Sequence, residues 1–326
     1  MKNKKGNEMN LTVTANFDIK KFLDTCKDLR PSSLIMDDVK WKYMVRSTIR
    51  GKNILLLGPT GCGKTLAAQT VAKVVGKENK FFYFNLGATQ DARASLIGNT
   101  HFDKSSGTFF KESSFVKAIR TPNAIILLDE ISRSHHDGVN ILMTVLDDLQ
   151  RYLRLDEKED SEIVKVADGV TFIATANVGN EYTATRVMDR ALLSRFPVKI
   201  EMTPLDRASE FELLKSRFDI TDVDKLDMLN AVCDIADHTR KQVKLEDSKI
   251  TNFLPTRSTV EIAELIVDGF NLLEIAETTI YPNFSDDGGV DSERTYVKQL
   301  VQKYIKTESK TNLFNDPIKE NNQVPF

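Results

Sequence analysis

The sequence is poor in the residue types that build disulfide and metal frameworks. Among its 326 residues it has only three cysteines, Cys26, Cys62 and Cys233, and no two of them are closely spaced. This argues against a disulfide scaffold or a zinc site and suits a reducing compartment, so we expect the cytoplasm. Of the four histidines only His135 and His136 are neighbours, and adjacent side chains point apart, so we expect no metal chemistry from them.

Long apolar runs and an excess of one charge are also missing. No segment approaches the roughly 20 apolar residues of a transmembrane helix, and residues 1–10 lack the apolar stretch of a secretory signal. The 45 Lys and Arg residues are matched by 47 Asp and Glu residues, so the formal net charge is −2. The composition therefore predicts no membrane partner and gives no indication of a nucleic-acid-binding surface.

A glycine-rich loop between an apolar run and a helix-like segment is the most informative feature that is present. Residues 53–57 are the apolar run, Leu66 continues the helix-like segment, and the loop reads Gly58-Pro59-Thr60-Gly61-Cys62-Gly63-Lys64-Thr65. In such a loop the backbone N–H groups face phosphates, the lysine reaches the β- and γ-phosphates, and the hydroxyl binds Mg²⁺. The sequence therefore predicts that these residues bind ATP and Mg²⁺.

A second apolar run, residues 124–128, ends in Asp129 and Glu130. A buried parallel strand that ends in acids delivers charge to the carboxyl edge of a sheet. We expect Asp129 to hold Mg²⁺ together with Thr65, and Glu130 to deprotonate the attacking water. The alternative is a core strand that ends in two solvated acids, but the phosphate loop favours the catalytic interpretation.

Two further segments offer groups that could act on the γ-phosphate. The apolar residues 170–176 lead into Asn177, whose amide could hold the water or the γ-phosphate. Arg195 ends a short helix-like segment just before residues 198–202, where it could reach the nucleotide of a neighbouring subunit. Arg190 lies one and a half turns earlier and is a rival for this role, and a solvated helix face is the alternative for both arginines.

Taken in order, these segments resemble the motifs of AAA+ ATPases of the MoxR-like, dynein-related branch. They are similar to those of the ATPase subunit of cobaltochelatase (CobS). The resemblance covers roughly residues 35–275 and includes Walker A, Walker B, sensor 1, an arginine-finger segment and a sensor 2 position at residues 255–258. It implies a five-stranded parallel αβα P-loop domain followed by a small all-helical lid. It also implies a homo-oligomeric ring, usually a hexamer, with ATP at each subunit boundary.

The chain departs from the family pattern at two positions. Ser132 stands where the family commonly has Asn, and Ser194 stands where an Asp usually precedes the finger. Neither change removes a reacting group. Together they leave the orientation of the finger open. Arg195 is favoured over Arg190, because the Arg195-Phe196 pair directly before a strand is the position that matches the family.

The same resemblance predicts the domain boundaries. We expect an N-terminal extension over residues 1–34, an ATPase core over 35–203, a helical lid over 204–306 and a polar tail over 307–326. Helix-like periodicity over residues 209–218, 223–243 and 258–275 supports the lid.

Two insertions are expected within the core. One, about residues 91–112, has a Gly- and Ser-containing stretch at 98–108, and the other, about residues 151–168, alternates like a β-hairpin. Four aromatic side chains of the first insertion are candidates for gripping a client protein, although packing under a loop fits them equally: His101, Phe102, Phe109 and Phe110.

Arg257 falls in the first turn of the last predicted lid helix. A helix dipole disfavours a cation at its N-terminus, so Arg257 calls for a nearby anion, and the γ-phosphate is the obvious one. The alternative is a solvated arginine.

Several functions remain compatible with the sequence. One is a ring that remodels or activates a partner protein, possibly one with a von Willebrand A domain. Others are the ATPase subunit of a metal chelatase, a nucleic-acid motor, and a switch that binds ATP without hydrolysing it. The near-neutral charge argues against the motor, and the presence of Glu130, Asn177 and a finger arginine argues against the switch.

Overall fold

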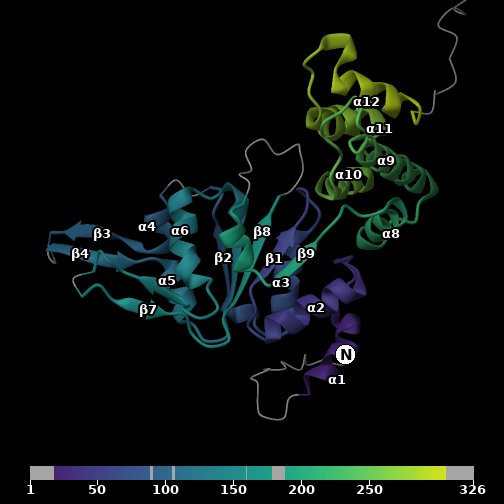
Figure 1. The fold of residues 1–326 in the computed structure, drawn as a ribbon. Coiled ribbons are helices and arrows are strands. Elements are labelled where there is room, and N and C mark those ends of the chain that lie inside the picture. Colours follow the sequence, from purple (N-terminus) through teal and green to yellow (C-terminus); the bar gives the residue numbers. More distant parts are fainter. Residues whose placement is uncertain (1–17, 89–90, 105–106, 159, 178–187, 306–326) are drawn as a thin grey trace, which may run out of the picture. The chain divides into compact units, whose positions relative to one another are not determined.

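The computed structural model describes residues 18–88, 91–104, 107–158, 160–177 and 188–305 (Figure 1). The expected tail, 307–326, and the first part of the expected N-terminal extension lie outside the described residues. Contacts divide the chain into two compact units. The first comprises Met1–Arg217 with Pro255–Arg257, and the second comprises Phe218–Leu254 with Ser258–Phe326.

A five-stranded, fully parallel sheet with strand order β2-β5-β8-β1-β9 is the centre of the first unit (Figure 1). Parallel strands that are covered on both faces need near-continuous apolar runs, and the predicted apolar runs supply them. The bounds are β1 Ile54–Leu57, β2 Phe81–Asn85, β5 Ile125–Asp129, β8 Thr171–Ala176 and β9 Val198–Glu201.

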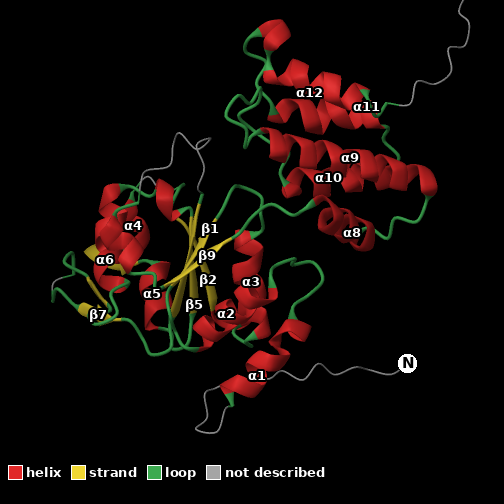
Figure 2. Cartoon of the chain, turned by 45° about the vertical axis from the view of Figure 1, so that its right-hand side comes forward, coloured by secondary structure: helices red, strands yellow, loops and turns green. Residues whose placement is uncertain are grey.

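Two long helices, α2 Asp38–Ile49 and α3 Lys64–Val74, cover one face of the sheet (Figure 2). Every second strand residue, such as Ile54 and Leu56, packs against them. Trp41 of α2 is fully buried there, and its indole N–H donates a 2.8 Å hydrogen bond to the carbonyl of Cys26. Cys26 is the first residue of a 3₁₀ turn, Cys26–Leu29, which follows α1 Ile19–Thr25.

Three shorter helices cover the other face: α4 Ala92–Leu96, α5 Ser114–Arg120 and α6 His136–Val145 (Figure 2). The alternate strand residues, among them Leu55 and Phe172, pack against this layer. Phe115 of α5 meets Phe84 of β2 edge to face, with ring centroids 5.2 Å apart. The predicted αβα architecture is therefore confirmed.

Each expected insertion contains a two-stranded antiparallel hairpin. The first, β3 Gly98–Asp103 with β4 Gly107–Glu112, was expected only as a Gly- and Ser-containing stretch, so that expectation missed its strands. The second, β6 Tyr152–Arg154 with β7 Ile163–Lys165, is the hairpin expected there.

The four aromatic side chains of the first hairpin do not share one environment. Phe102 is 75% exposed and Phe109 is 42% exposed, and the ring of His101 stacks on Phe109 at 5.9 Å. Phe110 is only partly exposed and packs against the core cluster. Three of the four candidates for client contact are therefore on the surface.

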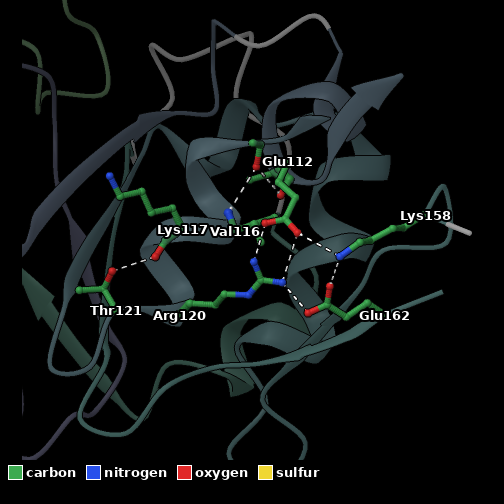
Figure 3. A network of polar contacts seen from close by, with 9 residues as sticks. Glu112, Val116, Lys117, Arg120, Thr121, Lys158 and Glu162 are labelled. Atoms are coloured by element: carbon green, nitrogen blue, oxygen red, sulfur yellow. Dashed lines mark hydrogen bonds and ion pairs between the residues drawn. The ribbon is translucent and has the colours of Figure 1, made fainter. Parts of the chain in front are cut away.

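A network of ion pairs fastens the two hairpins to each other (Figure 3). Arg120, at the end of α5, contacts Glu112 of β4 and Glu162 of the second insertion, each at 2.5 Å. Lys158 reaches the same two carboxylates, with Glu112 at 3.5 Å and Glu162 closer. Hydrogen bonds from Lys158 and Arg120 lower the pKa of Glu162. Four alternating charges therefore link the hairpins at neutral pH.

Two 3₁₀ turns and two helices complete the first unit in the part that the structure describes. They are the 3₁₀ turns Glu78–Lys80 and Ile131–Arg133 and the helices α7 Arg190–Ser194 and α8 Arg207–Arg217. We expected α8 to belong to the lid, whereas the contact division counts it with the first unit.

The second unit is helical in the part that the structure describes. Its helices are α9 Val223–Gln242, most of α10 Thr256–Asp268, α11 Leu272–Ile275 and α12 Glu293–Gln302, and a π turn, Ala276–Ile280, continues α11. Two 3₁₀ turns, Tyr281–Asn283 and Gly289–Asp291, precede α12. Among the described residues, no helix combines the length and apolar character that crossing a bilayer requires.

One predicted helix of this unit is in fact two. Residues 258–275 were expected to be continuous, but α10 ends at Asp268 and α11 starts at Leu272. Gly269 has φ +96°, and Asn271 caps α11 in a capping box with Glu274. A left-handed glycine followed by an N-cap ends one helix and starts another.

Candidate functional site

The phosphate loop connects β1 to α3 along a path that requires glycine. Gly58 has φ +155°, and a Cβ at this position would lie 2.2 Å from the carbonyl oxygen of Met202. Gly63, the N-cap of α3, is left-handed with φ 86°. The N-terminus of α3 thus follows directly on the loop, which is the arrangement that binds phosphates.

The ammonium group of Lys64 is buried within this loop, and the residue is 8% exposed. It donates hydrogen bonds to the carbonyls of Gly58 at 2.9 Å and Pro59 at 2.7 Å, and to Oδ1 of Asn177 at 2.9 Å. The pKa of Lys64 is lowered, chiefly by burial, and Arg257 adds to the lowering. A buried cation whose three donors are all occupied is poised to exchange these neutral acceptors for an anion.

Cys62, in the same loop, contributes through its backbone. Burial raises the pKa of its thiol, so the side chain stays protonated at neutral pH. Its sulfur lies 3.9 Å from Nζ of Lys64. A protonated thiol is a weak acceptor and does not neutralise the lysine.

Three hydroxyl groups surround the carboxylate of Asp129 at the end of β5. Thr65 and Thr175 approach Oδ1 at 3.4 and 2.5 Å, and Tyr83 of β2 donates to Oδ2 at 2.9 Å. Burial and the hydrogen bond to Asp129 raise the pKa of Tyr83, so its phenol remains a donor.

The oxygen donors of Thr65 and Asp129 fit Mg²⁺, which prefers hard oxygen ligands and completes its shell with water and substrate phosphates. Within the described ranges, His, Cys, Asp and Glu side chains nowhere gather in groups of three or more that could hold a metal ion. The site therefore suits a metal that arrives with a phosphate ligand and does not suit a dedicated protein cage.

Glu130 follows in a strained backbone conformation, with φ 56° and ψ 41°. Its N–H donates a 2.9 Å hydrogen bond to Oγ1 of Thr175, and its carboxylate pairs with Arg133 at 3.3 Å. Non-glycine residues in this left-handed region are uncommon and cluster at functional sites. The carboxylate is partly exposed, which leaves it accessible to water.

The two candidate finger arginines differ in their surroundings. Arg195 follows α7, and its guanidinium pairs with Asp147 at 3.1 Å and donates to the carbonyl of Met143 at 3.4 Å. Arg190, at the start of α7, is exposed. Neither arginine has a described contact with Lys64 or Glu130, so the structure does not bring them into the cluster.

Arg257 is exposed and lies beside the phosphate loop within the first unit. A Cβ added to Gly61 would lie 2.8 Å from Cβ of Pro255 and 3.7 Å from Cβ of Arg257. Together with its effect on the pKa of Lys64, this places a second positive charge near the loop. Two cations near one glycine-rich loop call for an anion between them.

A cavity of about 250 Å³ adjoins the loop through Met202. Its walls come from the start of α2 with the segment before it, and from the end of β9 with the chain after it. The lining residues are Ile35, Met36, Asp37, Lys40, Glu201, Met202, Thr203, Pro204, Leu205 and Asp206.

The sequence did not point to two residues of the site. The hydroxyl of Tyr83 contacts Asp129 from the neighbouring strand, and Gly87 lies against the carboxylate of Glu130. Tyr83 carried one weak signal, because its hydroxyl is a polar group between the two phenylalanines Phe82 and Phe84.

The sequence is similar to one known protein family and to several known proteins. The family described as AAA domain (dynein-related subfamily) matches residues 53–196. A Thauera aromatica protein named "Putative chaperone BssE" is 31% identical over 223 residues, which cover 68% of this chain and 72% of that protein. The mitochondrial Lon protease homolog 1 of Dictyostelium discoideum is 30% identical over 238 residues, 66% of this chain but only 23% of that protein. An uncharacterized protein of Staphylococcus saprophyticus is 32% identical over 175 residues, 52% of this chain and 63% of that protein.

Proposed function

The chain belongs to the AAA+ ATPases, with an AAA domain of the dynein-related subfamily, and we propose that it hydrolyses ATP with Mg²⁺ in a homo-oligomeric ring that remodels or activates a partner protein. The observation that carries this proposal is the single cluster of Lys64, Asn177, Thr65 and Asp129 at the carboxyl edge of the sheet. Ligands of parallel α/β sheets bind at that edge.

Each residue of the cluster takes a separate step in the proposed reaction. Lys64 and the loop N–H groups bind the β- and γ-phosphates, while Thr65 and Asp129 hold Mg²⁺, which neutralises charge on the phosphates. Glu130 takes the proton of the attacking water. Asn177, whose amide oxygen accepts from Lys64 at 2.9 Å, holds the water or the γ-phosphate.

The nucleotide exchanges one set of contacts for another. Its phosphates replace the carbonyls of Gly58 and Pro59 as acceptors for Lys64, so the buried charge gains an anionic partner. Arg257 adds the second cation and senses the γ-phosphate.

We further propose that each site is completed by a neighbouring subunit in a hexamer. A cation in trans over the γ-phosphate accelerates phosphoryl transfer by about 10³ to 10⁵ in well-studied systems. Arg195 fills this role, with Arg190 as the rival. Because Arg195 pairs with Asp147 within its own chain, it must leave that carboxylate to reach a neighbour.

The two linked hairpins are the proposed contact with the partner. Exposed aromatic side chains grip other proteins at low entropic cost, and His101, Phe102 and Phe109 lie on the surface. The name of the Thauera relative, a putative chaperone, supports a chaperone ahead of the chelatase alternative, and we propose that it is of the MoxR-like kind. A cytoplasmic partner with a von Willebrand A domain fits this function.

The proposal is tested by separating ATP binding from turnover. Lys64→Ala should lose binding of a fluorescent ATP analogue, because the phosphates lose their buried cation. Glu130→Gln should keep binding and lose phosphate release, because it changes only the group that acts on water. Lys73→Ala, an exposed lysine near the end of the same helix, is the matched control and should retain both. Equal loss of binding in Lys64→Ala and Glu130→Gln would refute the assignment.

A further inference from the structure

One buried hydroxyl group joins the two acidic residues of the site. Thr175, the penultimate residue of β8, is 1% exposed. Its Oγ1 donates to Oδ1 of Asp129 at 2.5 Å and accepts the N–H of Glu130 at 2.9 Å. A threonine hydroxyl has one proton and two lone pairs, so both contacts form at once.

Few other described groups bond to the two atoms that Thr175 contacts, Oδ1 of Asp129 and the N–H of Glu130. Oδ1 of Asp129 also faces Thr65, but at 3.4 Å, so Thr175 is its closer donor. Glu130 has a left-handed backbone, which persists only where the surroundings fix it, and its N–H is bonded to Thr175. Without this hydroxyl, the part-buried N–H of Glu130 would lose its partner, and Oδ1 of Asp129 would keep only the more distant hydroxyl of Thr65.

We propose that Thr175 is a positioning residue that aligns the metal-binding carboxylate and the water-activating carboxylate together. The inference rests on the proposed function, since it assigns Thr175 to the same reaction. The described hydrogen bonds of the Thr175 hydroxyl go to Asp129 and Glu130 and not to Lys64, so nucleotide binding without metal should not depend on this hydroxyl. Its loss should therefore change Mg²⁺ dependence and turnover, and should spare metal-free nucleotide binding.

The same strand supplies a matched control. Thr171 begins β8, is fully buried and donates its hydroxyl to the carbonyl of Thr48 at 3.0 Å. Thr171→Val thus removes a buried threonine hydrogen bond from the same strand at a distance from the site. An effect that Thr171→Val and Thr175→Val share is therefore caused by a change in the fold and not by misalignment of the carboxylates of Asp129 and Glu130.

The experiment measures ATP turnover against Mg²⁺ concentration in full-length protein, and binding of a fluorescent ATP analogue in EDTA. For Thr175→Val we expect kcat to fall about 10- to 100-fold and half-saturation by Mg²⁺ to shift upward by a similar factor, as for other groups that orient metal ligands. Analogue binding in EDTA should stay within about twofold. Thr175→Ser keeps the hydroxyl and should restore both parameters, whereas Thr171→Val should leave Mg²⁺ half-saturation unchanged.

An unchanged Mg²⁺ half-saturation in Thr175→Val, or the same shift in Thr171→Val, would overturn the inference. If circular dichroism shows that Thr175→Val does not fold, Thr175→Cys replaces it, because a thiol is a weak donor of similar size, and the same shift is expected. Failure of the proposed function would look different: the unmodified protein itself would bind ATP without hydrolysing it.

Discussion

Gly87 provides the room in which the carboxylate of Glu130 lies. A Cβ built on Gly87 would lie 2.3 Å from Oε2 and 3.0 Å from Cβ of Glu130, whereas ordinary contact begins at 3.4 Å. In Gly87→Ala the oxygen must therefore move by about 1.1 Å, the difference between 3.4 and 2.3 Å. The φ angle of Gly87 lies outside the left-handed region, so alanine fits the backbone itself.

This displacement predicts a specific loss of rate. A misplacement of about 1 Å in a reacting group can cost on the order of 10² in rate, which is about 2.7 kcal/mol of transition-state stabilisation. Nucleotide binding should be spared, because Lys64 and the loop carbonyls are untouched. We therefore expect kcat to fall about 100-fold while KM for ATP stays within about threefold.

The assay is steady-state ATP turnover by Gly87→Ala, Glu130→Gln and the double variant. If Gly87→Ala acts through Glu130, the double variant should be no slower than Glu130→Gln alone, since groups in contact are not additive. Full turnover in Gly87→Ala would refute the reasoning. So would a double variant in which the two losses multiply.

Two further predictions concern the cations at the phosphate loop. Arg257→Ala should weaken discrimination of ATP from ADP more than it weakens ADP binding, as measured by calorimetry. An unchanged preference for ATP would mean that Arg257 is a solvated arginine that does not sense the γ-phosphate. Burial lowers the pKa of Lys64 in the free protein, and bound phosphates favour its charged form, so ATP affinity should fall as pH rises from that lowered pKa toward the ordinary lysine value of about 10.4. Titration of analogue binding against pH checks this, and Lys64→Arg should flatten the fall because arginine stays charged; an equal fall in both proteins would count against the pKa argument.

Much of the site could be predicted because parallel strands end at one edge of the sheet. That rule alone brings Lys64, Asp129 and Asn177 together, and each follows an apolar run that the sequence displays. The contact of Tyr83 with Asp129 could not be predicted in this way. It depends on β2 lying next to β5, and the order of strands in a sheet is not written in any one segment.

Three other features of the structure were not predicted from the sequence, for different reasons. Gly87 looks like an ordinary loop glycine, because only the folded chain shows which side chain lies against it. The ion pair between Arg195 and Asp147 joins segments far apart in sequence. The break after Asp268, by contrast, did leave a signal: Gly269 and Asn271 are the residues that end and start helices, and apolar periodicity on both sides concealed them.

ATP turnover in mixed assemblies tests most directly the central claim that a neighbouring subunit completes each site. Glu130→Gln and Arg195→Ala should each be inactive alone, and mixing them should restore turnover, because a boundary can then pair an intact Glu130 with an intact Arg195. Asp147→Asn, which removes the partner of Arg195 but keeps the arginine, is the control and should stay active. If Arg190→Ala is inactive alone and recovers in the mixture, whereas Arg195→Ala does not, the finger is Arg190. Mixed assemblies that form but recover with neither variant would contradict the account.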